Sequence, residues 1–137
     1  MQQRMTRPNV DRDTFMRWVL GWGAVFNLVA ASLFVFPTSQ LGQLVGMPVS
    51  APPMYSAMLA WFVVLFGGAY AWLACQTNID RTIVALAALG KTGVFSIILA
   101  CWLSDVVVGT AVLGATGDLV FATIFAWWLL RGPAKPA

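Results

Sequence analysis

The feature that most constrains this chain is a series of four apolar stretches, each about as long as a helix that crosses a lipid bilayer. They cover about residues 15–36, 54–74, 82–103 and 106–130. A hydrocarbon layer of ~30 Å is crossed by about 20 mostly apolar residues in a helix, and a helix satisfies its own backbone hydrogen bonds there. Four spans with short connectors account for nearly all of the 137 residues. The sequence therefore predicts an all-α integral membrane four-helix bundle over residues 15–130.

Two polar tails flank this domain. Residues 1–14 are basic and contain a proline, and we expect them to form a cytoplasmic tail in which Asp13 or Thr14 caps the first helix. Residues 131–137 follow the last span and contain two cations. We expect this second tail to be cytoplasmic as well.

The connectors between the spans differ in length and polarity. Residues 38–53 carry no charge, and the spacing of Leu41, Leu44 and Val45 predicts a short amphipathic segment at the outer interface. Ser104 and Asp105 predict a tight connection between the third and fourth spans.

The distribution of cations predicts the orientation. Lys and Arg accumulate on cytoplasmic flanks, and under a four-span arrangement seven of the eight cations fall on one side of the membrane. These seven are Arg4, Arg7, Arg12, Arg17, Arg81, Arg131 and Lys135. The chain is therefore expected to have both termini inside, as a multi-pass protein of the bacterial cytoplasmic (inner) membrane.

Composition argues against several classes of function. Histidine is absent, which removes the commonest ligand for zinc, copper and haem, so no metal and no cofactor is predicted. The cations are divided among two tails and a loop, so topology explains them better than a nucleic-acid partner does. Cys75 and Cys101 fall near opposite ends of their helices, too far apart for a disulfide.

Two ionisable residues lie inside the predicted spans, Lys91 in the third and Asp118 in the fourth. Each costs about 2.5–3.5 kcal/mol at the centre of an isolated helix. Counted from the cytoplasmic ends, Lys91 lies at a depth of ~14 Å, and Asp118 and Asn27 at ~18 Å. The three side chains are expected to meet in one layer, as the candidate ligand or ion site, with no catalytic residue assigned.

Hydroxyls and small residues surround this predicted layer. The hydroxyls of Thr92, Ser96, Thr116 and Thr123 are expected to add to it. Small residues let helices approach closely in lipid, and this role is expected for Gly67, Gly68, Ala71, Gly90, Gly93, Gly114 and Gly117. Together they predict a compact bundle without a wide aqueous pore.

The polar layer has two interpretations. In the first, a Lys91–Asp118 salt bridge bonded to Asn27 only fixes the register of the bundle, as buried pairs often do. In the second, the layer receives a ligand, an ion or a proton, since ionisable residues inside a membrane commonly mark pathways. The sequence leaves both open.

The helical plan, the uncharged connector with its FP and LGQLVGMP segments, and the GKTGVF segment of the third span resemble small bacterial four-helix membrane proteins of the DoxX-like group. The resemblance implies a membrane protein that is sometimes an accessory partner of a redox or secretion system. It carries over no catalytic residues.

Three functional hypotheses follow. The leading one is a non-enzymatic membrane protein that acts as an accessory subunit or as a binder of a lipophilic ligand, with membrane lipids, other membrane proteins or further copies of itself as partners. The second is a homodimeric proton- or ion-coupled transporter that uses Lys91 and Asp118. The third is a membrane enzyme acting on an isoprenoid or sterol-like substrate, with the same two residues as acid and base.

Overall fold

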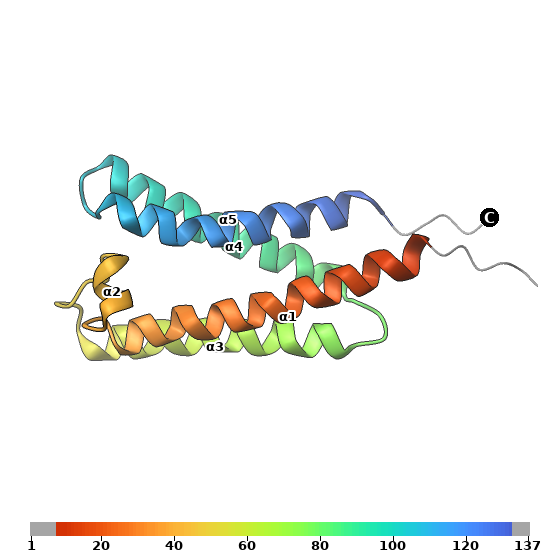
Figure 1. Ribbon diagram of the computed structural model, residues 1–137, viewed down its shortest axis with the longest axis horizontal. Coiled ribbons are helices and arrows are strands. Elements are labelled where there is room, and N and C mark those ends of the chain that lie inside the picture. Colours follow the sequence, from red (N-terminus) through yellow and green to blue (C-terminus); the bar gives the residue numbers. More distant parts are fainter. Residues whose placement is uncertain (1–7, 133–137) are drawn as a thin grey trace, which may run out of the picture.

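The computed structural model describes residues 8–132, and the side chains from residue 12 onward. This part of the chain forms four long helices and one short one, without strands (Figure 1). They are α1 (Pro8–Val35), α2 (Gln40–Leu44), α3 (Pro53–Cys75), α4 (Arg81–Leu103) and α5 (Gly109–Leu130). The four long helices are each long and apolar enough to cross a membrane. The protein is an all-α, multi-pass membrane protein with a four-helix bundle.

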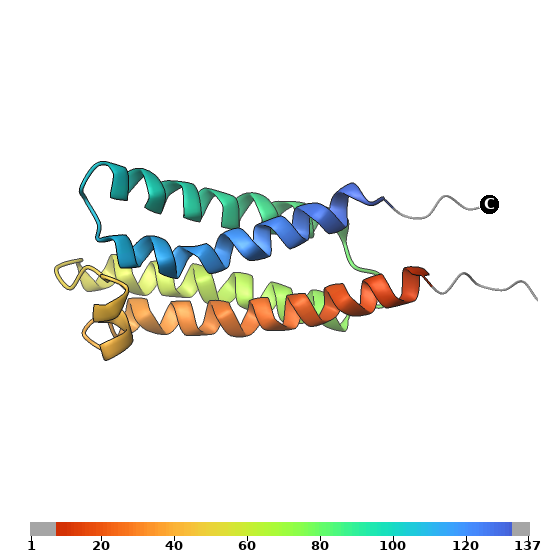
Figure 2. The same cartoon turned by 45° about the horizontal axis from the view of Figure 1, so that its top comes forward.

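The bundle consists of two antiparallel hairpins, α1 with α3 and α4 with α5 (Figures 1 and 2). Backbones approach closely within each hairpin, whereas the two hairpins meet mainly through side chains. The start of α1, the α3–α4 loop and the end of α5 lie at one end, which we call the inner end. The α4–α5 connection and α2 lie at the other, the outer end. The two cysteines are free thiols at opposite ends of the bundle, as predicted.

The first helix begins earlier than the sequence predicted. It starts at Pro8 rather than near residue 15, so the proposal that Asp13 or Thr14 caps it is wrong. Proline is favoured in the first turn because its fixed φ suits a helix and its missing N–H is not needed there. Asp13 instead accepts a hydrogen bond from Trp128 Nε1 of α5, at 3.3 Å.

The last helix begins later than predicted, at Gly109 rather than Val106. Asp105 has a φ of 56°, and its N–H and that of Val106 donate to the carbonyls of Trp102 and Cys101. This is the Schellman arrangement that ends a helix in a left-handed residue, a conformation that aspartate tolerates better than most residues. The three valines that follow, Val106 to Val108, lie between the helices.

The predicted short helix in the first connector is present as α2. Ser39 caps it by accepting from the N–H of Gly42 at 3.1 Å, and Gly46, with a φ of 69°, ends it. Leu41 and Leu44 are exposed, as expected of a segment at a membrane interface. The following residues reach the second hairpin, because Val45 packs on the face of Gly114.

Large buried side chains are concentrated in the inner half of the bundle. The core contains, from all four long helices, Met16, Val19, Leu20, Ala24, Tyr70, Leu73, Val84, Ala87, Phe125 and Trp128. The rings of Tyr70 and Phe125 meet edge to face with centroids 5.8 Å apart, an arrangement that aromatic pairs prefer. This core packs the two hairpins against each other. It thereby sets the position of Asn27, Lys91 and Asp118, which lie next to it toward the outer end.

Candidate functional site

Lys91 of α4 is held between two oxygen atoms from the other helices. Its Nζ lies 2.6 Å from Asp118 Oδ1 of α5 and donates to Asn27 Oδ1 of α1 at 3.1 Å. The side chain of Lys91 is 5% exposed and that of Asp118 17%, and Asn27 is buried. The predicted meeting of these three residues, which we call the polar layer, is confirmed, and so is the ion pair within it.

Asn27 extends the polar layer to the fourth long helix. Its Nδ2 donates to the backbone carbonyl of Val63 in α3 at 3.3 Å. Gly67 makes room for it, since a Cβ added at Gly67 would lie 3.2 Å from Asn27 Cβ. A single chain of hydrogen bonds therefore runs from α3 through α1 and α4 to α5.

Aromatic rings cover the ammonium group of Lys91. The ring centroids of Phe26, Phe121 and Tyr70 lie 5.0, 5.2 and 5.6 Å from its Nζ, within the range of cation–π attraction. Phe26 also packs on Gly117, where a Cβ would lie only 2.5 Å from Phe26 Cε2. A side chain at position 117 would therefore force the ring that covers the lysine to shift.

Asp118 is the least enclosed member of the polar layer. Its Oδ1 pairs with Lys91, whereas its Oδ2 makes no hydrogen bond within residues 8–132. The ammonium group, by contrast, has two oxygen partners and three rings around it. Asp118 is therefore the member of the polar layer that is most accessible from outside the bundle.

The hydroxyls expected in the polar layer do not join it. Each bonds to a carbonyl of its own helix, as Thr92 does to Ala88 and Thr123 to Leu119, both at 2.8 Å. Ser96 and Thr116 do the same, and all four residues are exposed. Back-bonding to a preceding turn satisfies a hydroxyl locally, so helical depth alone was not enough to predict their partners.

Only some of the small residues serve close packing between helices. Gly67 does so within the first hairpin and Gly117 between the hairpins. A Cβ at Gly68, Gly90 or Gly93 would meet no heavy atom within 4 Å, so the expectation that these three glycines bring helices together is wrong. On α4, the register that buries Lys91 turns Gly90 and Gly93 away from the neighbouring helices.

The arginines at the inner end bind helix ends, which the sequence did not reveal. Arg12 donates to the carbonyls of Arg131 and Gly132 after α5, both at 3.0 Å, and Arg81 donates to that of Leu129. The guanidinium groups of Arg12 and Arg81 also lie 6.0 and 5.0 Å from the ring of Trp128. Cations favour the negative end of the helix dipole, so these side chains fasten α1 and α4 to the end of α5.

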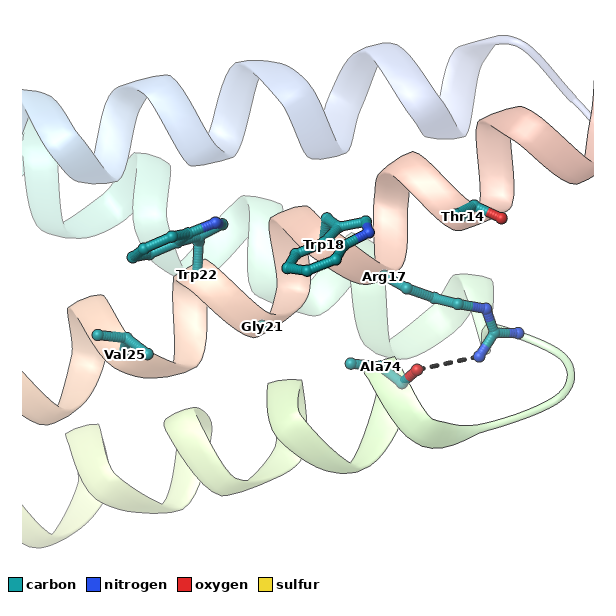
Figure 3. A pocket seen from close by; sticks show the side chains of 7 residues that line it. All are labelled: Thr14, Arg17, Trp18, Gly21, Trp22, Val25 and Ala74. Atoms are coloured by element: carbon teal, nitrogen blue, oxygen red, sulfur yellow. Dashed lines mark hydrogen bonds between the residues drawn. The ribbon is translucent and has the colours of Figure 1, made fainter.

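A groove of about 440 Å³ lies on α1 and α3 in the inner half of the bundle (Figure 3), and no residue of the polar layer lines it. It is lined by Thr14, Arg17, Trp18, Gly21, Trp22, Val25 and Ala74. Figure 3 shows the two indole rings on one side of α1, with Arg17 reaching toward the C-terminal end of α3. The sequence carries a signal for it, a tryptophan pair four residues apart beside an arginine, but nothing in the sequence alone marks that pair as a groove.

Arg17 is fixed at the edge of the groove by the end of α3. Its Nη1 donates to the carbonyl of Ala74 at 3.0 Å and its Nη2 to that of Thr77 at 2.8 Å. Trp18 and Trp22 are 69% and 64% exposed. The groove therefore combines an oriented cation with two open aromatic surfaces.

Within residues 8–132, no group of three or more Cys, Asp or Glu side chains is placed to hold a metal ion. No protein-family model, no curated protein and no solved structure matches this chain.

Proposed function

We propose that this chain is a non-enzymatic membrane protein that acts by binding a lipophilic molecule. The groove beside Trp18 and Trp22 is the observation that carries the proposal. It offers apolar and aromatic surface with one fixed cation, Arg17, and binding sites for small molecules are commonly mostly apolar with a few placed polar groups. Such a surface suits an amphiphile better than a polar solute.

The bonding within the polar layer supports a structural role for it. The ammonium group of Lys91 has Asn27 and Asp118 as partners, and the layer connects all four long helices. An acid–base role for the same pair would need Lys91 to reach a substrate, whereas its Nζ is bonded to both oxygens and covered by aromatic rings. A polar layer that holds the helices together agrees with a binding site on the membrane-facing surface of the bundle, such as the groove.

We place the protein in the bacterial cytoplasmic membrane with the inner end in the cytoplasm. Arg12, Arg17, Arg81 and Arg131 share that end, in agreement with the accumulation of cations on cytoplasmic flanks. Arg4, Arg7 and Lys135 lie outside the described residues. The groove then faces the inner leaflet. The resemblance to DoxX-like proteins is compatible with this proposal, and an accessory role beside another membrane protein is its second form.

The proposal is tested by filling the groove. A Cβ at Gly21 would meet nothing within 4 Å, so Gly21→Leu fills the hollow between the indoles without a clash at the backbone. Gly90→Leu is the matched control, at an equally open glycine on α4. Native mass spectrometry after purification in a mild detergent should show a co-purifying amphiphile with the wild type and Gly90→Leu, and its loss with Gly21→Leu. A bare protein in all three cases would contradict the proposal.

One observation favours a second function, proton- or ion-coupled transport. The Oδ2 atom of Asp118 has no partner among the described residues, and its side chain is more exposed than that of Lys91. A carboxylate that can exchange its proton is what such a transporter needs. Asp118→Asn should then abolish a proton flux measured in proteoliposomes. A flux that is absent from the wild type, or unchanged in the variant, would remove this candidate.

A further inference from the structure

We propose that the groove binds an anionic phospholipid of the inner leaflet, with the phosphate beside Arg17 and an acyl chain along Trp18, Gly21 and Trp22. This inference rests on the proposed function, because it names the chemical class of the lipophilic molecule. It adds a charge preference that an apolar groove alone would not have.

One face of α1 forms the floor of the groove. Thr14, Trp18, Gly21, Trp22 and Val25 line it, at the three- and four-residue spacing that places side chains on one side of a helix. From Thr14 to Val25 this face extends ~16 Å along the helix axis. Gly21 lies between the two indoles and leaves a hollow there. The floor is thus an elongated, mostly apolar track that runs along the membrane normal, which suits an extended acyl chain.

The cation lies at the end of the track nearer the inner end of the bundle. Arg17 precedes Trp18, and both of its hydrogen-bond partners are neutral backbone carbonyls, those of Ala74 and Thr77. Among the side chains of residues 12–132, no carboxylate lies within salt-bridge distance of it. A guanidinium group held in this way is pre-organised for a phosphate, with which arginine forms strong charge-assisted hydrogen bonds.

The surrounding charges favour an anionic over a zwitterionic headgroup. The inner end has four arginines within residues 8–132, and three aspartates, Asp11, Asp13 and Asp80. Asp13 accepts from Trp128 Nε1, and Asp80 accepts from the backbone N–H groups of Thr82 and Ile83. The excess positive charge at headgroup level attracts anionic lipids. A headgroup with its own cation would gain less.

The test compares two lipids that differ in their headgroup, one anionic and one zwitterionic, and share the same acyl chains. The full-length protein is reconstituted in nanodiscs containing equal amounts of phosphatidylglycerol and phosphatidylcholine with identical acyl chains. Native mass spectrometry then counts the lipids that stay bound as detergent is added. We expect phosphatidylglycerol to be retained over phosphatidylcholine by about fivefold, from one arginine at headgroup level.

The variants separate charge from apolar contact. Arg17→Gln should remove the preference, whereas Arg131→Gln, which removes an equal charge from α5 outside the groove, should keep it. Trp22→Leu should weaken retention of both lipids, and Trp72→Leu is its matched control because both tryptophans are 64% exposed. If Arg17→Gln does not fold, Arg17→Lys keeps the charge, and added salt should then lower its lipid preference toward one.

The outcomes distinguish this inference from the proposed function. Equal retention of both lipids, lost in Gly21→Leu, would overturn the charge preference and leave a lipophilic groove. Retention unaffected by Gly21→Leu would overturn both. A preference for phosphatidylglycerol that Arg17→Gln leaves unchanged, or that salt does not reduce in Arg17→Lys, would also overturn the role of Arg17.

Discussion

The two halves of the bundle on either side of the polar layer are packed in different ways. The inner half buries large side chains from all four long helices, among them Leu20, Tyr70 and Phe125. In the outer half, the buried side chains of the long helices are three alanines, Ala31, Ala60 and Ala115. From Lys91 to the outer end of α4, no further residue of this helix is buried. The polar layer is therefore the boundary between a filled core and a much thinner contact.

This difference shows where the stability of the bundle resides. Lipid is as apolar as the helices, so they associate through packing and hydrogen bonds rather than through a hydrophobic force. In the inner half, the large side chains provide the packing, and the arginines that bind helix ends provide hydrogen bonds. The stability of the outer half depends on the adjacent polar layer and on the first connector, where Val45 packs on Gly114. Substitutions should therefore have unequal effects on the two sides of Lys91.

The largest effect is expected at the boundary itself. Lys91→Met leaves the half-buried carboxylate of Asp118 without its partner inside the bundle, which should lower the free energy of unfolding by about 3 kcal/mol. The double variant Lys91→Met with Asp118→Leu removes both charges and should recover most of this loss. Unfolding in mixed micelles, followed by circular dichroism, measures both. A double variant as unstable as the single one would show that the pair does more than fasten helices.

A smaller effect is expected from one substitution made on both sides of the boundary. Leu20 is 0% exposed in the inner half of α1, and Leu28 is 55% exposed in its outer half. Leu20→Ala should cost at least ~2 kcal/mol because it leaves a cavity, whereas Leu28→Ala should cost less than ~1 kcal/mol. The same unfolding measurement applies. Equal losses would mean that the outer half is packed as well as the inner half.

The smallest effect is expected at the glycines of the boundary. Gly117→Ala places a Cβ against the ring of Phe26, and such overpacking should cost about 1–3 kcal/mol. Gly93→Ala meets open space and should be neutral or stabilising by about 0.5–1 kcal/mol, since alanine loses less entropy in a helix. Thermal unfolding in one detergent ranks the two variants. A destabilising Gly93→Ala would point to a partner helix on that face.

The sequence predicted the features that depend on length and depth. The apolar stretches predicted the four spans, and the antiparallel arrangement of neighbouring spans predicted that Lys91 would meet Asp118. Side-chain direction was not predictable from depth, so the hydroxyl of Thr92 was expected in a layer from which it points away. The expectation that Gly90 and Gly93 bring helices together was wrong for the same reason, because their direction on α4 does not follow from their depth.

The contacts at the inner end depend on tertiary structure and were missed. Arg17 was interpreted as a topological signal, but it also binds the last turn of α3, 57 residues away in the sequence. Asp13 was expected to cap its own helix, whereas the structure directs it to Trp128. Only the packing of the hairpins brings these residues together, and the groove between α1 and α3 arises from that packing too.

The position of the ion pair within the topology has a consequence for the biogenesis of the protein. Lys91 and Asp118 belong to consecutive helices, so both charges enter the membrane with the same hairpin. Each can neutralise the other before that hairpin docks onto the first one, and the translocation machinery never has to release a lone buried charge into lipid. Asn27, which carries no charge, meets Val63 within its own hairpin and Lys91 only after the two hairpins dock.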